Sequence, residues 1–351
     1  LFIILKKIAY QLITLFGVVS IVFVLFNALS SDPSKLLVGQ RTNAASLEQA
    51  KKALHLDVPV WKRYGLYLND LSPISHISIL EANAGNFEYY PIYSTSNSVW
   101  VLKFPYLGRS YITKKKVSDM LINALPGTLV LAIAAMLFAC ITGIALGIWA
   151  ALRVQTWVDK SIVMFSVFGI SMPSFFVALL VAYLFGYVWH AITGLEMMGS
   201  LLIYDPITGM PQVQLKNLIL PAMALGIRPL AVITQLTRNA MLEVWSQDYI
   251  RTAFAKGLST YKVVMRHALR NALNPVLTAV SGWLAELLAG SFFIEYIFAW
   301  KGIGKITVDA LNNFDFPVVM GAVLLTAFIF IVISMLTELL YAQLDPRIKH
   351  S

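Results

Sequence analysis

Six long runs with almost no charge restrict what this sequence can fold into. A helix that crosses a bilayer core of about 30 Å needs about 20 apolar residues. Runs of that length, each with at most one charged side chain, cover residues 8–31, 120–152, 161–195, 217–237, 271–294 and 316–337. Because lipid cannot satisfy open backbone groups, we expect each run to be a helix. The sequence therefore predicts an all-α, polytopic membrane protein with six transmembrane helices.

The low share of charged residues agrees with this fold class. It is 13% here, whereas a soluble domain has about 25%. The first run is longer than the core of a usual signal peptide and no clean A-x-A site follows it, so we expect 1–32 to remain as an N-terminal transmembrane helix. Cys140, the only cysteine, allows no internal disulfide and no cysteine metal cluster. Gly143 and Gly147 permit close helix approach, either within this chain or between subunits.

Lysine and arginine are unevenly distributed between the two sides of the predicted bundle. With the N-terminus inside, the inner side holds Lys6, Lys7, Arg153, Lys160, Arg238, Arg347 and Lys349 together with a basic segment over 246–272, and the short outer loops hold only Lys216, Lys301 and Lys305. Because short cytoplasmic loops carry the excess of positive charge, we expect both termini, including the tail 346–351, in the cytoplasm. Topology thus explains the net charge of +9, and we expect no nucleic-acid partner.

The long loop over 33–118 is predicted to form a small extracytoplasmic subdomain. Residues 46–71 have helix-like spacing, and residues 88–108 are rich in aromatic and β-prone residues with turn residues between them. This subdomain contacts a partner or caps the bundle, and the sequence favours neither.

The basic segment over 246–272 contains DYIRTAFAKGLSTYKVVMRHALRNA and has the pattern of two short helices. Asp248 can cap the first helix or stabilise its dipole. An apolar stripe follows at Ile250, Ala253, Phe254 and Leu258. Gly257 offers the left-handed conformation that ends a helix, and Ser259 can cap the second helix. Pro275 marks the entry into the next run.

The second helix of this elbow carries a basic face. Its cationic residues, Lys262, Arg266 and Arg270, recur every four positions. A basic amphipathic segment can lie on anionic lipid headgroups. A paired-helix elbow between the fourth and fifth spans also suits docking into a groove on a cytoplasmic protein.

Several motifs together resemble the B-type permease subunits of dipeptide, oligopeptide and nickel ABC importers. DYIRTAFAKGLS resembles their EAA coupling motif with Gly257 at its glycine, although Arg251 stands where the general motif has Glu. Thr252 and Ala253 stand where the two alanines fall. Further landmarks follow in order: LPGTLVLAIAAMLFACITGIALGIWAALR (125–153), FGISMPSFFVALL (168–180), LPAMAL (220–225), LTRNAMLEV (236–244), FIEYIFAWKGIGK (293–305) and LDPRIK (344–349). The likeness covers 1–73 and 103–351, and the insert around 74–102 is longer than expected.

The resemblance implies a type I ABC importer (MetI-like) permease fold with a five-helix core over 119–345. It implies a transporter subunit and not an enzyme, placed in a bacterial inner membrane and serving ATP-driven import of oligopeptides or dipeptides. Nickel chelates and other small cargoes stay open. The implied partners are a second homologous permease subunit, two cytoplasmic ATPase subunits, an extracytoplasmic solute-binding protein and the lipid bilayer. ATP and Mg²⁺ are expected on the ATPase subunits, and no cofactor is expected on this chain.

In this interpretation the elbow docks the ATPases and transmits force to the spans. The expected coupling residues are Asp248, Tyr249, Arg251, Ala253, Lys256, Gly257, Leu258, Ser259, Lys262 and Arg266. The alternative from another class is a proton-coupled secondary transporter. It would need a relay of acidic groups through the spans, and the acidic candidates for such a relay are only Glu286 and Glu295.

Charges and prolines inside the runs are the remaining candidates. Ionisable residues in a span usually face the bundle interior or a water-filled path. Arg228 and Glu286 either form an intramembrane ion pair or line the path and meet peptide termini. Pro173 and Pro229 can bend helices as hinges or as static kinks. Glu295, at a position that resembles a family acidic site, anchors the following turn or contacts cargo.

No catalytic or metal site is expected. The segment AWKGIGKIT (299–307) invites comparison with a P-loop. Ala299 stands where the first glycine of that motif belongs, and Ile306 stands where its hydroxyl belongs. The five histidines show neither H-x-x-x-H nor H-E-x-x-H spacing.

Overall fold

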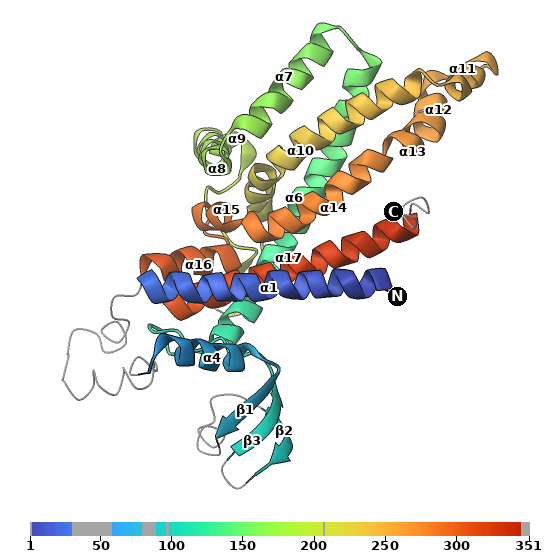
Figure 1. The fold of residues 1–351 in the computed structure, drawn as a ribbon. Helices are drawn as coiled ribbons and strands as arrows, with labels where there is room; N and C mark the ends of the chain where they lie inside the picture. The colour runs from blue at the N-terminus through green and yellow to red at the C-terminus, as the bar shows by residue number, and fades with distance from the viewer. Residues whose placement is uncertain (1, 30–57, 79–88, 96–97, 206–207, 345–351) are drawn as a thin grey trace. The chain divides into compact units, whose positions relative to one another are not determined.

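The protein is described here by a computed structural model of residues 2–29, 58–78, 89–95, 98–205 and 208–344 (Figure 1). Contacts divide the chain into two compact units, Leu1–Asn123 with Asp309–Ala327, and Ala124–Val308 with Phe328–Ser351. The expected cytoplasmic tail 346–351 and much of the loop 33–118 lie outside the described residues.

Apolar side chains hold the helices of the first unit together. Val19 and Val22 of α1 (Phe2–Leu29) are buried with Leu324 of α17 (Phe316–Leu344). Tyr67 and Leu68 of α4 (Val60–Leu71) pack against this cluster. The helix α4 lies where the sequence predicted helix within 46–71, and the earlier part of that segment lies outside the described residues.

A small antiparallel sheet also belongs to the first unit. Its strands are β1 (Ile74–Ser78), β2 (Tyr89–Ser94) and β3 (Ser98–Lys103), in the order β1-β3-β2. Val99 and Val101 are buried with Ile77, while Trp100 and Leu102 are exposed, which is the two-residue period of a strand. The β-prone composition of 88–108 predicted β2 and β3. The five residues of β1, ISHIS, carry too weak a pattern to be predicted.

The second unit is built from helices and one small two-stranded sheet (Figure 1). In chain order its elements are α6 (Val117–Leu152, which begins in the first unit), α7 (Trp157–Ser171), α8 (Ser174–Tyr183), the π-helix η1 (Leu184–Val188), α9 (His190–Thr193), β4 (Leu202–Tyr204), β5 (Pro211–Val213), α10 (Lys216–Trp245), α11 (Asp248–Ala255), α12 (Thr260–Val263), the π-helix η2 (Val264–Ala268), α13 (Leu269–Ala272), α14 (Asn274–Gly290), α15 (Phe292–Ile297) and α16 (Ile303–Asn312, which ends in the first unit). The part of α17 from Phe328 on also belongs to the second unit.

Four described helices are long and apolar enough to cross a membrane: α1, α6, α10 and α17. The predicted third span is not one straight helix, because α7 and the segment Ser174–Val188 meet at 113°. Met172 is extended at the break, as expected for a residue before proline, and Pro173 is the N-cap residue of α8. The predicted fifth span corresponds to α14, which has 17 residues and is followed by the short α15.

Glycine lets α6 and α10 approach closely inside the second unit. A Cβ atom on Gly147 would lie 2.7 Å from the carbonyl oxygen of Thr234, and one on Gly226 would lie 2.7 Å from that of Ala135. Gly143 faces Leu230 of α10 in the same way, at 2.9 Å. The sequence left open whether Gly143 and Gly147 serve contacts within or between subunits, and both make a contact within the chain.

Candidate coupling elbow and membrane pocket

The segment 246–272, the coupling elbow, folds as two short helical pieces at the end of α10 (Figure 1). The first, α11, begins at Asp248 and ends at Ala255. Gly257 then has a φ of 78°, the left-handed conformation that glycine adopts at little cost. Ser259 precedes α12 with extended backbone. The chain continues through η2 and α13 into α14, where Pro275 lies in the first turn.

Details of the capping differ from the sequence prediction. Gln247, and not Asp248, occupies the N-cap of α11, so Asp248 acts from the first turn, where its charge favours the helix dipole. Ser259 occupies the N-cap of α12 without a side-chain capping hydrogen bond. The π-helix η2 was not predicted, since the sequence around it has no glycine or proline that would mark it.

The apolar face of the elbow is buried against the spans. Ile250 and Ala253 of α11 join Val263, Val264 and Ala268 in one buried cluster. The cluster includes Met241 of α10, with Ile148 and Ala151 of α6 packed against it. This packing fixes the elbow to two long helices at once.

The opposite face of the elbow is exposed and carries its charged residues, together with Phe254 of the predicted apolar stripe, which is 38% exposed. Of the ten predicted coupling residues, eight are exposed: Asp248, Tyr249, Arg251, Lys256, Gly257, Ser259, Lys262 and Arg266. Leu258 is half-buried and Ala253 is buried, so these two pack the elbow internally instead of presenting a docking surface. Asn271 donates a hydrogen bond of 2.8 Å to the Tyr249 hydroxyl, which links α13 to α11.

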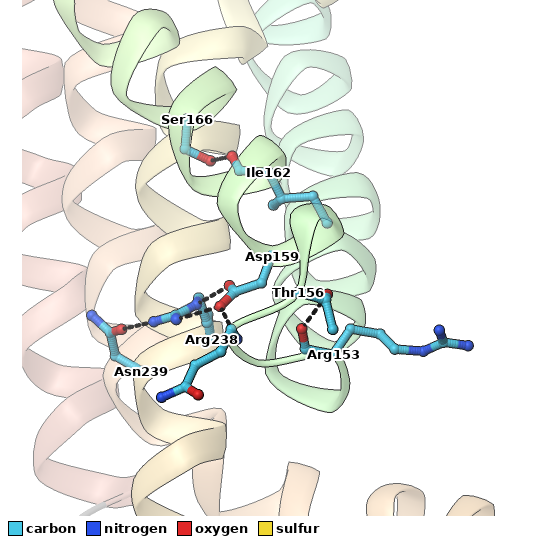
Figure 2. Close-up of polar contacts among 8 residues, drawn as sticks. Arg153, Thr156, Asp159, Ile162, Ser166, Arg238 and Asn239 are labelled. Carbon is cyan, nitrogen blue, oxygen red and sulfur yellow. Dashed lines mark hydrogen bonds and ion pairs between the residues drawn. The ribbon is translucent and has the colours of Figure 1, made fainter.

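A partly buried ion pair that the sequence did not predict joins α7 to α10, with its arginine eight residues before the elbow begins (Figure 2). Arg238 of α10 donates from Nε to Oδ1 of Asp159 at 2.5 Å and from Nη2 to Oδ2 at 2.8 Å. Asp159 is 3% exposed and also accepts the N–H of Gln155 at 3.0 Å. The pair joins the first turn of α7 to α10. Asp159 is the only acidic residue between 120 and 195, and that isolation was the signal available in the sequence.

A pocket in the second unit contains the two charges predicted inside the spans. Arg228 of α10 and Glu286 of α14 both line it, beside Trp283 and the residues Gly169 and Ser174 from either side of the α7–α8 break. Both charged side chains are exposed, and the guanidinium carbon of Arg228 lies 6.0 Å from the centre of the Trp283 ring. Among the described residues, no ion pair within 4.0 Å joins Arg228 to Glu286.

Glu295 is the centre of a buried polar cluster, here called the Glu295 node. It is 0% exposed, and its Oε1 accepts the hydroxyls of Thr128 (2.8 Å) and Ser291 (2.7 Å). The N–H groups of Gly304 and Lys305 donate to the same carboxyl group. Burial raises the pKa of Glu295, and these four donors oppose that rise. The geometry is that of an anchor for the turn into α16, the first of the two roles considered for Glu295.

The two candidate hinge prolines occupy different settings. Pro173 lies at the break between α7 and α8, where the chain changes direction. Pro229 is buried inside α10, which continues as a helix on both sides of it. Within the described residues, no group of three or more His, Cys, Asp or Glu side chains is placed to hold a metal ion.

Comparison with known proteins places this geometry in a family. The family described as "Binding-protein-dependent transport system inner membrane component" matches residues 143–350, and the N-terminal region of such membrane components matches residues 1–132. The "Di/tripeptide transport system permease protein DppB" of Pseudomonas aeruginosa is 35% identical over 98% of both chains. The "Dipeptide transport system permease protein DppB" is 33% identical in Alkalihalophilus pseudofirmus, over 96% of both chains, and 32% identical in Escherichia coli K12, over 99% of this chain and 98% of that one.

A solved structure agrees on the fold. The MetNI methionine ABC transporter, in an inward-facing conformation, has a chain that matches with a TM-score of 0.50 and 16% identity, covering 65% of this chain and 97% of that one. The fold is therefore the MetI-like fold of type I ABC importers, in a multi-pass inner membrane protein that is a permease subunit and not an enzyme. The chain belongs to the family of binding-protein-dependent transport system inner membrane components.

Proposed function

We propose that this chain is the membrane-spanning subunit of an ATP-driven importer of short peptides, and that its coupling elbow receives the motion of cytoplasmic ATPase subunits. Peptide cargo is supported by relatives named for dipeptide and di/tripeptide transport that match nearly the whole chain. Membership of the ABC permease family favours this function over the proton-coupled alternative.

The observation that carries the coupling role is the division of the elbow into two faces. Its buried apolar residues, such as Ile250 and Val263, pack with residues of α6 and α10, so a displacement of the elbow moves both helices. Its charged residues point to solvent, with the side chains of Asp248 and Arg251 94% and 76% exposed. A rigid two-helix element with a polar outer face suits a contact that transmits movement.

The remaining partners and the orientation belong to the same proposal. The elbow and both termini lie on the cytoplasmic side, as the distribution of lysine and arginine favours. Two ATPase subunits bind ATP and Mg²⁺ there. A second homologous permease subunit completes the pathway, and a solute-binding protein delivers cargo on the outer side.

The substitution Gly257→Val tests the coupling role. A β-branched residue is strained at a φ of 78° and will shift the turn between α11 and α12. We expect the assembled transporter in proteoliposomes to lose most ATP-driven peptide uptake while the subunit remains in the membrane. Gly194→Val is the matched control, because Gly194 also has a positive φ, of 61°, and lies outside the elbow. A Cβ atom at either glycine would meet no other atom within 4 Å, so the two substitutions differ in place and not in crowding.

Two measurements distinguish the outcomes. Co-purification in mild detergent is expected to recover ATPase subunits and a second permease with the wild-type chain. Wild-type uptake by the Gly257→Val transporter, with Gly194→Val equally active, would rule out the coupling role of the elbow turn.

A further inference from the structure

The pocket between α8, α10 and α14 holds two opposite charges that do not pair with each other. Arg228 and Glu286 both line it and both are exposed. No described residue forms an ion pair with either of them within 4.0 Å. Charged groups inside a membrane protein are costly, and they usually mark a path for polar cargo. The arrangement therefore suits a ligand that brings its own pair of charges.

The surroundings of Arg228 restrict where its guanidinium can point. The Trp283 ring lies 6.0 Å from the guanidinium carbon, at the outer limit of a cation–π contact. A guanidinium held near one ring face still has N–H groups for a carboxylate, which it can bind with two parallel hydrogen bonds. Arg228 is thus suited to take a carboxylate group.

The rest of the pocket is mostly apolar. Val177, Leu225 and Leu287 contribute to its walls. At a rise of 1.5 Å per residue, Arg228 lies about 25 Å along α10 from the end that carries the elbow, so the pocket is separate from the coupling contact. A pocket with apolar walls and a few polar groups is the usual form of a small-molecule site.

We propose that this pocket binds short zwitterionic peptides during transport, with Arg228 taking the terminal carboxylate and Glu286 taking the terminal ammonium. The inference rests on the proposed function, because it takes this chain to be part of a peptide pathway. Arg228 and Glu286 line the same pocket, so a short peptide with one charge at each end is the ligand proposed to contact both. Longer peptides can engage one charge at a time.

Equilibrium binding tests the assignment without the solute-binding protein. The assembled transporter in nanodiscs is titrated with radiolabelled dialanine, in competition with N-acetyl-dialanine and with dialanine amide. Wild-type transporter is expected to bind dialanine saturably and to prefer it over each blocked form by about tenfold, the order expected for a lost charge-assisted hydrogen bond.

Each substitution is expected to remove one part of this preference. Arg228→Gln removes the discrimination against the amide and keeps that against the acetylated form, and Glu286→Gln does the reverse. Lys216→Gln is the control, since Lys216 is an exposed cation on the same helix and lies outside the pocket. It is expected to keep both preferences.

Three results would overturn the assignment. They are an absence of saturable binding to wild-type transporter, unchanged preferences in both variants, and failure of Arg228→Gln to co-purify with the second permease subunit, which would make Arg228 an interface residue. Uptake assays with the solute-binding protein distinguish a failure of this inference from a failure of the proposed function, the import of short peptides. Peptide uptake without pocket binding refutes the inference alone, whereas no peptide uptake by the wild type refutes the proposed cargo.

Discussion

The coupling elbow and the Glu295 node place their polar side chains in opposite environments. In the elbow, charged groups such as Asp248 and Arg251 face solvent and apolar groups such as Ile250 face the spans. In the node, the carboxyl group of Glu295 is fully buried and accepts four hydrogen bonds from the chain itself. The elbow leaves its charged side chains available to a partner, whereas the carboxyl group of the Glu295 node is hydrogen-bonded within the chain.

This difference separates residues that maintain the fold from residues that contact partners. A buried polar group whose partner is removed loses its hydrogen bond and stays desolvated, so the free energy of unfolding falls. An exposed charge returns to water, so its removal changes stability little. Substitutions in the interior are therefore expected to reduce folding, and substitutions on the outer face of the elbow are expected to reduce transport in a folded protein.

The largest loss of stability is expected from Arg238→Gln. It leaves the buried Asp159 carboxylate with the N–H of Gln155 as its one remaining hydrogen bond among those described. Breaking a fully buried ion pair from one side costs about 3–5 kcal/mol, and we expect a cost near the lower end because the Arg238 side chain is 21% exposed. Thermal unfolding of the purified protein in detergent should show the apparent Tm reduced by roughly 5 to 10 °C.

The control for Arg238→Gln is Arg153→Gln. Arg153 is an exposed arginine in the same region, between α6 and α7. Its loss is expected to change the free energy of unfolding by less than about 0.5 kcal/mol. Equal Tm values for the two variants would show that the Asp159–Arg238 pair does not stabilise the fold. Removing this interior contact would then change stability as little as removing an exposed charge of the elbow.

A smaller loss is expected from Glu295→Gln. The amide keeps one acceptor oxygen, but its NH₂ group faces donors that the carboxylate satisfied, so buried N–H and O–H groups lose their acceptor. The expected decrease in the free energy of unfolding is about 2 kcal/mol. It can be measured as a lower Tm beside Glu243→Gln, an exposed glutamate of α10 that should be neutral. A wild-type Tm for Glu295→Gln would show that the Glu295 node does not stabilise the fold.

Much of this contrast could be predicted from the sequence. The apolar runs predicted α1, α6, α10 and α17, and the spacing of Ile250, Gly257 and Ser259 predicted the two-piece elbow with its left-handed turn. These features depend on local pattern: length of an apolar run, helical periodicity, and the conformational freedom of glycine. Local pattern does not depend on which distant segments meet.

The missed features depend on contacts between distant segments. Asp159 and Arg238 are 79 residues apart, and Thr128 and Glu295 are 167 apart, so no local spacing marks either contact. Two opposite charges in neighbouring spans made an Arg228–Glu286 ion pair plausible, yet the structure places both in one pocket without pairing them. Proline alone does not predict the 113° bend at Pro173, because Pro229 leaves α10 continuous.

The smallest change in stability, with a large change in function, is expected from Arg251→Ala on the outer face of the elbow. Arg251 contacts Asp248 at 3.4 Å, but both side chains are largely exposed, and such pairs contribute little to folding. The Tm should therefore stay within about 1–2 °C of the wild type. ATP-driven uptake should fall because the docking surface loses a charge, and Thr252→Ala on the same helix is a matched control for a small truncation at an exposed site. A lower Tm with unchanged uptake would contradict this prediction, because Arg251 would then stabilise the fold and would not contribute to docking.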